Sequence, residues 1–282
     1  MKKIIYPVVL VLVLGIGVFL MYSIWGAVSP RTAAEFTQSG KEFYSQKKYA
    51  EAIVEFQNAL QKNERDRDAR FLLARSYIGE GDLGSAVKEL RRLLEYYPGD
   101  EDASIQLGNL FLQAGTQNAQ YFREAKDLAE KVLAKNDKNV LAMILLGNSM
   151  AGLRDYASSI DTLEEALKLD PENPSALVSL GTTQAVQKNF AEAEQAFLKA
   201  RQVDPKNVPA LISLASYYQA TGKKAEAEAT FKEGLSMYPA DRQIYVPAAM
   251  FFVRDRFDQS EQILKEAQEC LPPRKLFMMA KA

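Results

Sequence analysis

Three segments decide the fold: Tyr49–Asn63 (YAEAIVEFQNALQKN), Tyr156–Pro171 (YASSIDTLEEALKLDP) and Phe190–Pro205 (FAEAEQAFLKARQVDP). In each of them, an aromatic residue opens a stretch in which small and large apolar side chains recur at matching places. The last two segments begin 34 residues apart, and the rest of the chain aligns at the same period. Self-similarity at a period of this length predicts a stack of repeated helix pairs.

The repeat can be followed seven times along the chain. The seven copies begin at Ala33, Arg67, Glu101, Val140, Pro174, Val208 and Arg242. The eighth residue of each copy is glycine or alanine, and helices approach to about 8–10 Å only where the side chains at the contact are small. One repeat buries too little apolar surface to fold alone, so stacking against its neighbours must supply much of the stability. We therefore expect an all-α fold, an α-solenoid of helix–turn–helix repeats over residues 33–274.

This arrangement resembles the tetratricopeptide repeat family over roughly residues 33–274. The resemblance rests on the small-residue spacing, on an aromatic residue before most second helices, and on prolines at the ends of repeats: Pro98, Pro171, Pro205, Pro239 and Pro272. The family's usual tryptophan at the fourth position is missing, and Arg70 is among the residues that replace it. The resemblance implies a protein that binds other proteins.

The composition excludes several classes of function. The chain has 35 basic and 36 acidic residues and a net charge of −1, so it lacks the basic excess expected of a nucleic-acid-binding protein. It has no histidine and one cysteine, Cys270, which removes histidine-based catalysis, disulfides within the chain and zinc-finger sites. Its carboxylate clusters are best explained as solvated helix residues. We therefore expect no enzyme activity, no metal and no cofactor.

The N-terminus predicts a membrane anchor. Residues 4–25 (IIYPVVLVLVLGIGVFLMYSIW) carry no charge and would reach roughly 33 Å as a helix, enough to cross the hydrocarbon core. The alternative is a cleaved signal peptide ending at Ala27-Val28-Ser29, although its apolar core would be unusually long and Pro30 would follow the cut. The predicted organisation is residues 1–3 in the cytoplasm, an anchor at 4–25 and a linker at 26–32.

Charges beside the anchor predict its orientation. Lys2 and Lys3 precede it, whereas Arg31 is the only basic residue between the anchor and Lys41. The positive-inside rule then places the N-terminus in the cytoplasm and the repeats in the periplasm, at a bacterial inner membrane. The expected function is a non-enzymatic scaffold for proteins of the cell envelope, similar to the tetratricopeptide proteins that accompany exopolysaccharide export and exosortase-type sorting. The alternatives are an accessory subunit of a large membrane complex, or a regulatory partner of a separate envelope enzyme.

The resemblance also implies a binding surface, because first helices line the concave face in this family. The residues that it assigns to partner binding are Phe71, Ile105, Asn109, Leu112, Ile144, Asn148, Val178 and Thr182. Asn109 and Asn148 hold the ninth position of successive first helices, and an amide can both donate to and accept from a peptide backbone. The alternative is that both amides bind water or a neighbouring helix. The family's lysine/asparagine/arginine clamp for chaperone C-termini is not expected, because the fifth positions are apolar here and the sixth positions lack arginine.

Two segments depart from the repeat. The third repeat has five additional residues, which we expect within the turn at Gln113–Tyr121, either as a tolerated surface insertion or as a contact for a partner. Residues 275–282 (KLFMMAKA) begin a further first helix where arrays usually carry a polar cap. We expect a partner or further chain to cover Leu276–Met279, with self-association through this helix as one possibility.

Overall fold

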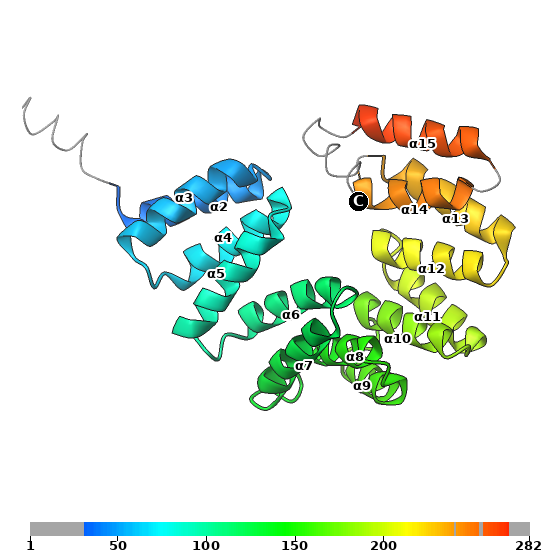
Figure 1. The fold of residues 1–282 in the computed structure, drawn as a ribbon, viewed down its shortest axis with the longest axis horizontal. Helices are drawn as coiled ribbons and strands as arrows, with labels where there is room; N and C mark the ends of the chain where they lie inside the picture. The colour runs from blue at the N-terminus through cyan, green and yellow to red at the C-terminus, as the bar shows by residue number, and fades with distance from the viewer. Residues whose placement is uncertain (1–30, 240, 254–255, 271–282) are drawn as a thin grey trace, which may run out of the picture. The chain divides into compact units, whose positions relative to one another are not determined.

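The computed structural model describes residues 31–239, 241–253 and 256–270. The segments expected at residues 1–3, 4–25 and 275–282 lie outside these ranges, as do all but the last two residues of the expected linker. Helices α2 to α15 make up the regular structure of the described residues (Figure 1). Among these helices, none is long and apolar enough to cross a membrane.

The chain divides into two compact units, and the boundary falls between Pro98 and Gly99. The described helices of the N-terminal unit are α2 (Ala33–Ser45), α3 (Tyr49–Lys62), α4 (Arg67–Glu80) and α5 (Leu83–Tyr96). Those of the C-terminal unit are α6 (Glu101–Gly115), α7 (Ala119–Leu133), α8 (Val140–Gly152), α9 (Tyr156–Leu169), α10 (Pro174–Val186), α11 (Phe190–Val203), α12 (Val208–Ala220), α13 (Lys224–Met237), α14 (Arg242–Phe252) and α15 (Phe257–Cys270).

Each repeat is a pair of helices, as the sequence predicts. Even-numbered helices are the first helices of the repeats, and each packs against the odd-numbered second helix that follows it. Within the C-terminal unit, the first helices α6, α8, α10, α12 and α14 also contact one another in that order. All seven first helices begin at the residue that the period predicts. The all-α solenoid of repeated helix pairs is therefore confirmed.

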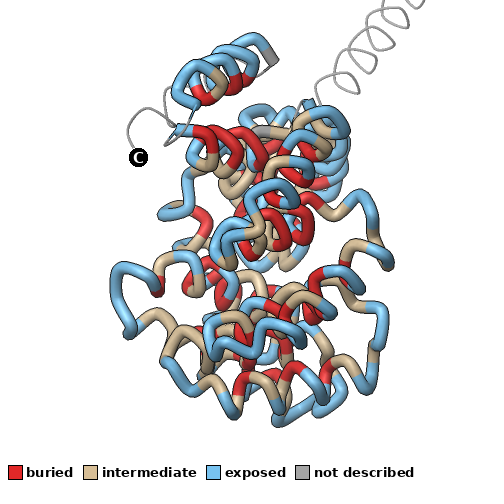
Figure 2. The backbone as a smooth tube through the Cα atoms, turned by 90° about the vertical axis from the view of Figure 1, so that its right-hand side faces the viewer, coloured by how far each residue is buried: buried red, intermediate tan, exposed pale blue. Residues whose placement is uncertain are grey.

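Small residues stand where the helices of a pair cross. A Cβ at Gly40 of α2 would lie 2.5 Å from Cε1 of Phe56 in α3, and one at Gly181 of α10 would lie 2.8 Å from Cε1 of Phe197 in α11. No real Cβ contact is this short, so the ring of each second helix occupies the space left by the glycine. Buried residues accordingly follow the sides on which paired helices meet (Figure 2).

The connectors between repeats supply the helix caps. Asp100 Oδ1 accepts a hydrogen bond of 2.9 Å from the backbone N–H of Ala103, and Asn173 Oδ1 accepts one of 3.1 Å from that of Ala176. Asp66, Asn139 and Asn207 cap their helices in the same way. Such caps typically contribute about 1 kcal/mol each, which explains why Asp or Asn precedes most first helices.

The turn inside a repeat contains a left-handed residue at a constant place. It is the fifteenth residue of the repeat in five copies: Lys47, Gly81, Arg154, Lys188 and Gly222, with φ between 58° and 84°. Only two of these five residues are glycines, which adopt this conformation without the steric cost that a Cβ brings. The other three turns therefore hold a residue that is locally strained.

The five additional residues of the third repeat do not enlarge its turn, contrary to the expectation from the sequence. The turn at 116–118 has three residues, like those at 46–48 and 187–189. Helix α6 instead runs to Gly115, and α7 begins at Ala119, three residues before the aromatic Phe122. The insertion lengthens the two helices because each added residue can then form its backbone hydrogen bonds within a helix.

Candidate functional site

The exposed side of α6 carries the best-formed group of predicted binding residues. Ile105, Asn109 and Leu112 are spaced four and three apart, so their side chains share one side of the helix. Asn109 is exposed, and the two apolar residues beside it are half-buried. Among the described residues nothing forms a hydrogen bond with the Asn109 amide. This surface therefore offers a free donor and acceptor between two apolar contacts.

Helix α8 carries two of the predicted residues, and they differ in exposure. Asn148 is half-buried and, like Asn109, has no hydrogen-bond partner in the described part of the chain. Ile144, by contrast, is only 7% exposed and packs in a core cluster with Leu163, Ala166 and Ala176. Ile144 therefore stabilises the stack of α8 on its neighbours and is not a surface residue.

On α10, one of the two predicted residues is exposed and the other is half-buried. Thr182 is exposed, and its Oγ1 donates a hydrogen bond of 2.8 Å to the carbonyl oxygen of Val178. Val178 is half-buried and packs against buried residues of two neighbouring core clusters. The hydroxyl of Thr182 is therefore the more accessible group of this pair.

Phe71 belongs to the N-terminal unit, whereas the other seven predicted residues belong to the C-terminal unit. It is half-buried on α4, between two arginines of the same helix. The guanidinium carbon of Arg67 lies 4.9 Å from the centre of the Phe71 ring, and that of Arg75 lies 5.9 Å away. Arg75 also lies 5.4 Å from the ring of Tyr44 in α2. The sequence singled out Phe71 but not the arginine beside it.

The charged side chains near Phe71 differ in whether they form ion pairs. Asp68 accepts from Lys41 Nζ at 3.1 Å and lies 3.4 Å from Arg67 Nη1. The hydrogen bond from Lys41, with a further contribution from Arg67, lowers the pKa of the Asp68 carboxyl. Asp68 thus stays ionised and holds both neighbouring cations. Arg75 is exposed and has no carboxylate partner in the described ranges.

A cavity of about 400 Å³ lies in the N-terminal unit, bordered by α3, α4 and α5. Arg70, only 3% exposed, stands at the fourth position of its repeat. Its Nη1 donates to Glu89 Oε2 at 2.6 Å, and its Nη2 donates to the carbonyl oxygen of Glu64, also at 2.6 Å. Its Nε is buried without a partner among the described residues. The guanidinium therefore ties α4 to α5 and to the connector before α4.

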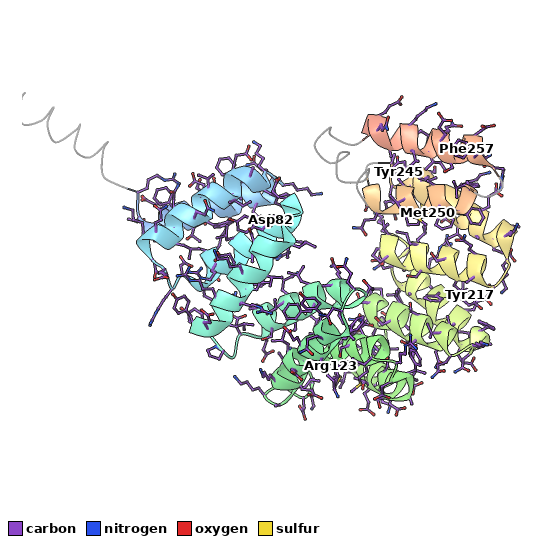
Figure 3. The ribbon with its side chains drawn as sticks, in the orientation of Figure 1. Asp82, Arg123, Tyr217, Tyr245, Met250 and Phe257 are labelled. Carbon is purple, nitrogen blue, oxygen red and sulfur yellow. The ribbon has the colours of Figure 1, made fainter. Side chains whose placement is uncertain are left out.

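The last described repeat exposes more apolar surface than the others. Val246, Met250 and Val253 follow one another at intervals of four and three, and each is at least 40% exposed. Figure 3 labels Met250 on α14. In α15, Leu264 is 43% exposed, whereas the corresponding eighth residues of α3, α5, α9, α11 and α13 are at most 2% exposed. Residues of the following first helix pack against four of them: Phe56, Leu163, Phe197 and Phe231. No described helix follows α15.

The most strongly perturbed carboxyl among the described residues belongs to an ion-pair network. Within them, no three histidine, cysteine, aspartate or glutamate side chains gather closely enough to hold a metal ion. Glu228, the carboxyl whose pKa is displaced furthest, to about 2, owes this to hydrogen bonds from Arg256 and Lys232. These cations hold it in an ion-pair network between α13 and the segment before α15, so its shift reflects structure.

Paired helices with small residues at their crossings and Asp or Asn caps between them define a class of helical repeat proteins. Two family models, both described as "Tetratricopeptide repeat", match the chain, one at residues 43–104 and 187–245 and the other at 144–208. Together these ranges cover more than half of the chain. The chain therefore belongs to the tetratricopeptide repeat family. No curated protein matches it.

Solved structures agree with this assignment. PilW, described as a type IV pilus biogenesis factor, is 18% identical and has a TM-score of 0.61, over 77% of this chain and 99% of its own. Pseudomonas aeruginosa pilF is 16% identical with a TM-score of 0.56, over 79% and 97%. A tetratricopeptide repeat protein from Parabacteroides merdae is 15% identical with a TM-score of 0.64, over 88% and 96%. At these identities the likeness extends to the fold alone.

Proposed function

We propose that the chain is a non-enzymatic scaffold that binds a segment of a partner protein on the exposed faces of its first helices. The observation that carries this proposal is the free amide of Asn109 between half-buried Ile105 and Leu112 on α6. An amide on a partly apolar surface can pair with a peptide group while the neighbouring side chains exclude water. The family to which the chain belongs supports protein binding as its general function.

We further propose that residues 4–25 anchor the scaffold in a bacterial inner membrane, with the repeats in the periplasm. The support is in the sequence: an uncharged run of membrane-spanning length preceded by Lys2 and Lys3. Such an anchor would confine the binding surface to the membrane and so favour partners of the cell envelope. This part of the proposal is independent of the binding surface and is tested separately.

Site-specific crosslinking tests the binding surface. A photo-reactive residue introduced at Asn109 or Thr182 should crosslink to a partner in native membranes, with mass spectrometry to identify it. The same residue at Glu165, an exposed position of the second helix α9, serves as the control. Crosslinks to one protein from the first-helix positions alone support the proposal. Equal crosslinking from Glu165 would show that the first-helix faces have no special role.

Reporter fusions test the anchor. Alkaline phosphatase joined after Gln38 should be active, because it folds in the periplasm, and a reporter that works only in the cytoplasm should be silent there. The reverse result would contradict the orientation. Sequencing the N-terminus of the mature protein decides between an anchor and a cleaved signal peptide, since a chain beginning at Pro30 would exclude the anchor.

A further inference from the structure

Helix α14 carries an apolar residue where the other first helices carry polar ones. Met250 holds the ninth position of its repeat and is 66% exposed. The residues at the ninth position of the other six repeats are all polar: Lys41, Arg75, Asn109, Asn148, Thr182 and Ser216. Met250 therefore sets α14 apart from the helices that carry the proposed binding residues.

Met250 belongs to a row of exposed apolar residues along α14. Val246 lies four residues before it and Val253 three residues after it, and they are 40% and 45% exposed. Val253 is the C-cap and keeps helical φ and ψ angles of −57° and −31°, so the three side chains share one side of the helix. From Gln243 to Val253 the chain has no charged residue. We call Val246, Met250 and Val253 the α14 stripe.

The α14 stripe is confined to one helix. On the preceding first helix, α12, the exposed residues at the ninth and twelfth positions are Ser216 and Gln219, which are polar. A segment that crosses several first helices would therefore leave this apolar surface after one contact. A helix lying along α14 would contact the whole stripe, because apolar residues spaced four and three apart form the seam through which two helices pack.

We propose that the α14 stripe binds α14 of a second copy of this chain, antiparallel about a two-fold axis at Met250. In such a pair, Met250 meets its own counterpart, and Val246 of each copy lies opposite Val253 of the other, because the two valines are nearly equidistant from Met250. The stripe is thus complementary to itself, as a two-fold interface requires. Its lack of charge matters as well, since identical charged surfaces would repel each other.

Three side chains from each copy make a small interface. Stable complexes usually bury about 800 Å² and about 20–30 residues on each partner, so the α14 stripe should hold two copies together weakly and only at high protein concentration. The proposed membrane anchor would favour pairing, because it confines the copies to one surface and so raises their effective concentration. The inference goes beyond the proposed function, since the stripe lies on a different helix from Asn109.

Disulfide crosslinking tests the partner and its orientation. Single cysteines are introduced into the full chain carrying Cys270→Ser, which is purified in an uncharged detergent and oxidised with copper phenanthroline. Met250→Cys should form a covalent dimer. Val246→Cys and Val253→Cys should each dimerise poorly alone, but a mixture of the two, one with a longer tag, should give the mixed dimer. Val54→Cys is the matched control, because Val54 is an exposed valine of α3, and it should crosslink poorly.

Analytical ultracentrifugation measures the association without a crosslink. In a density-matched detergent, the mass of the wild type should rise from that of one chain toward that of two as the concentration increases. Met250→Glu should keep the mass of one chain over the same range, because pairing would bury two like charges. Val54→Glu should behave as the wild type does. Melting curves of both variants should match that of the wild type, since both residues are more than half exposed.

The contrary outcomes are distinct. A wild type that keeps the mass of one chain, a dimer that persists in Met250→Glu, or equal crosslinking of Val54→Cys and Met250→Cys would overturn the inference. Strong dimers of Val246→Cys or Val253→Cys alone would overturn the antiparallel arrangement. None of these results would affect partner binding at Asn109, so the proposed function would stand.

Discussion

The ring of Phe122 lies directly over Gly152: a Cβ at that glycine would be 2.4 Å from Phe122 Cδ1. Phe122 belongs to the second helix of one repeat, α7, and Gly152 ends the first helix of the next, α8. The contact therefore joins two successive repeats, and it requires a residue without a Cβ atom at position 152.

Replacing Gly152 by Ala should destabilise the chain. The new methyl group would force the Phe122 ring, or one of the two helices, to move, at a cost of about 1–3 kcal/mol of unfolding free energy. Denaturation followed by circular dichroism measures the change. Gly84→Ala is the control, because the nearest atom to its new Cβ would be 3.7 Å away, and it should be neutral or stabilising by up to about 1 kcal/mol. Equal effects of the two substitutions would show that the Phe122 ring yields freely.

Substitutions at the left-handed turn residue should lower the stability where they remove a glycine and raise it where they introduce one. Gly222 has φ +78° and no atom within 4 Å of an added Cβ, so Gly222→Ala isolates the backbone cost, about 1–2 kcal/mol. Arg154 has φ 66°, and Arg154→Gly should relieve a similar strain and raise the melting temperature. A fall in melting temperature for Arg154→Gly would mean that its side chain contributes more than the turn conformation costs.

Arg70 should be intolerant of replacement unless its partner changes too. Arg70→Met leaves the Glu89 carboxylate, 15% exposed, without its guanidinium. Breaking a buried pair costs about 3–5 kcal/mol, and partial exposure of Glu89 favours the lower value. Adding Glu89→Gln should recover part of the loss, and a double-mutant cycle by urea denaturation measures the coupling. Additive effects would show that the two side chains act independently.

The ion-pair network at Glu228 should make stability depend on pH. Its pKa falls from 4.5 to about 2 in the folded chain because Arg256, ahead of Lys232, hydrogen-bonds the carboxylate. A carboxyl with a lowered folded pKa contributes stability above its unfolded pKa and loses that contribution as the pH falls toward 2. Glu228→Gln should therefore cost about 1 kcal/mol at neutral pH, given the partial exposure of the network, and progressively less below pH 4.5.

Unfolding curves at several pH values test the Glu228 prediction. Glu165→Gln is the control, because its pair with Lys168 is exposed on both sides, and it should have little effect at any pH. A difference between wild type and Glu228→Gln that does not change with pH would contradict the prediction.

The repeat register could be predicted from sequence because seven copies of one pattern reinforce each other. Each first helix begins where the period places it, from Ala33 to Arg242. The location of the five inserted residues could not be predicted, because the period does not say whether they lie in a helix or in a turn. Burial within the predicted surface also escaped prediction: Ile144 and Asn148 are one helical turn apart, yet packing from neighbouring helices covers only the first.

The chemistry of individual positions was the least predictable part. Arg75 is an exposed basic residue. One of its ring contacts, Phe71, lies one turn away on the same helix, but the other, Tyr44, comes from α2 of the preceding repeat. The buried state of Arg70 likewise depends on Glu89, nineteen residues away. Such contacts are set by three-dimensional packing, which an alignment of the repeats does not describe.

Asn109 and Asn148 should act in binding and not in stability. Both side chains lack hydrogen-bond partners in the described structure, so their joint replacement by Ala should leave the melting temperature almost unchanged. If each contributes about 0.5–1.5 kcal/mol to a partner complex, the double variant should bind about 5- to 150-fold more weakly. Calorimetry with the partner that crosslinking identifies measures the affinity of the wild type and of the double variant. Unchanged affinity would exclude the role, and a large fall in melting temperature would show that the amides are structural.

The exposure of Leu264 shows on which side of α15 a further first helix would pack. Its counterpart Phe231 is fully buried in a core cluster with Ile244 and Ala248 of the following first helix. A duplicated repeat placed after α15 would bring the same apolar residues, and it would meet a leucine already suited to receive them. A first helix that packed on α15 as α14 packs on α13 would therefore bury Leu264 as Phe231 is buried.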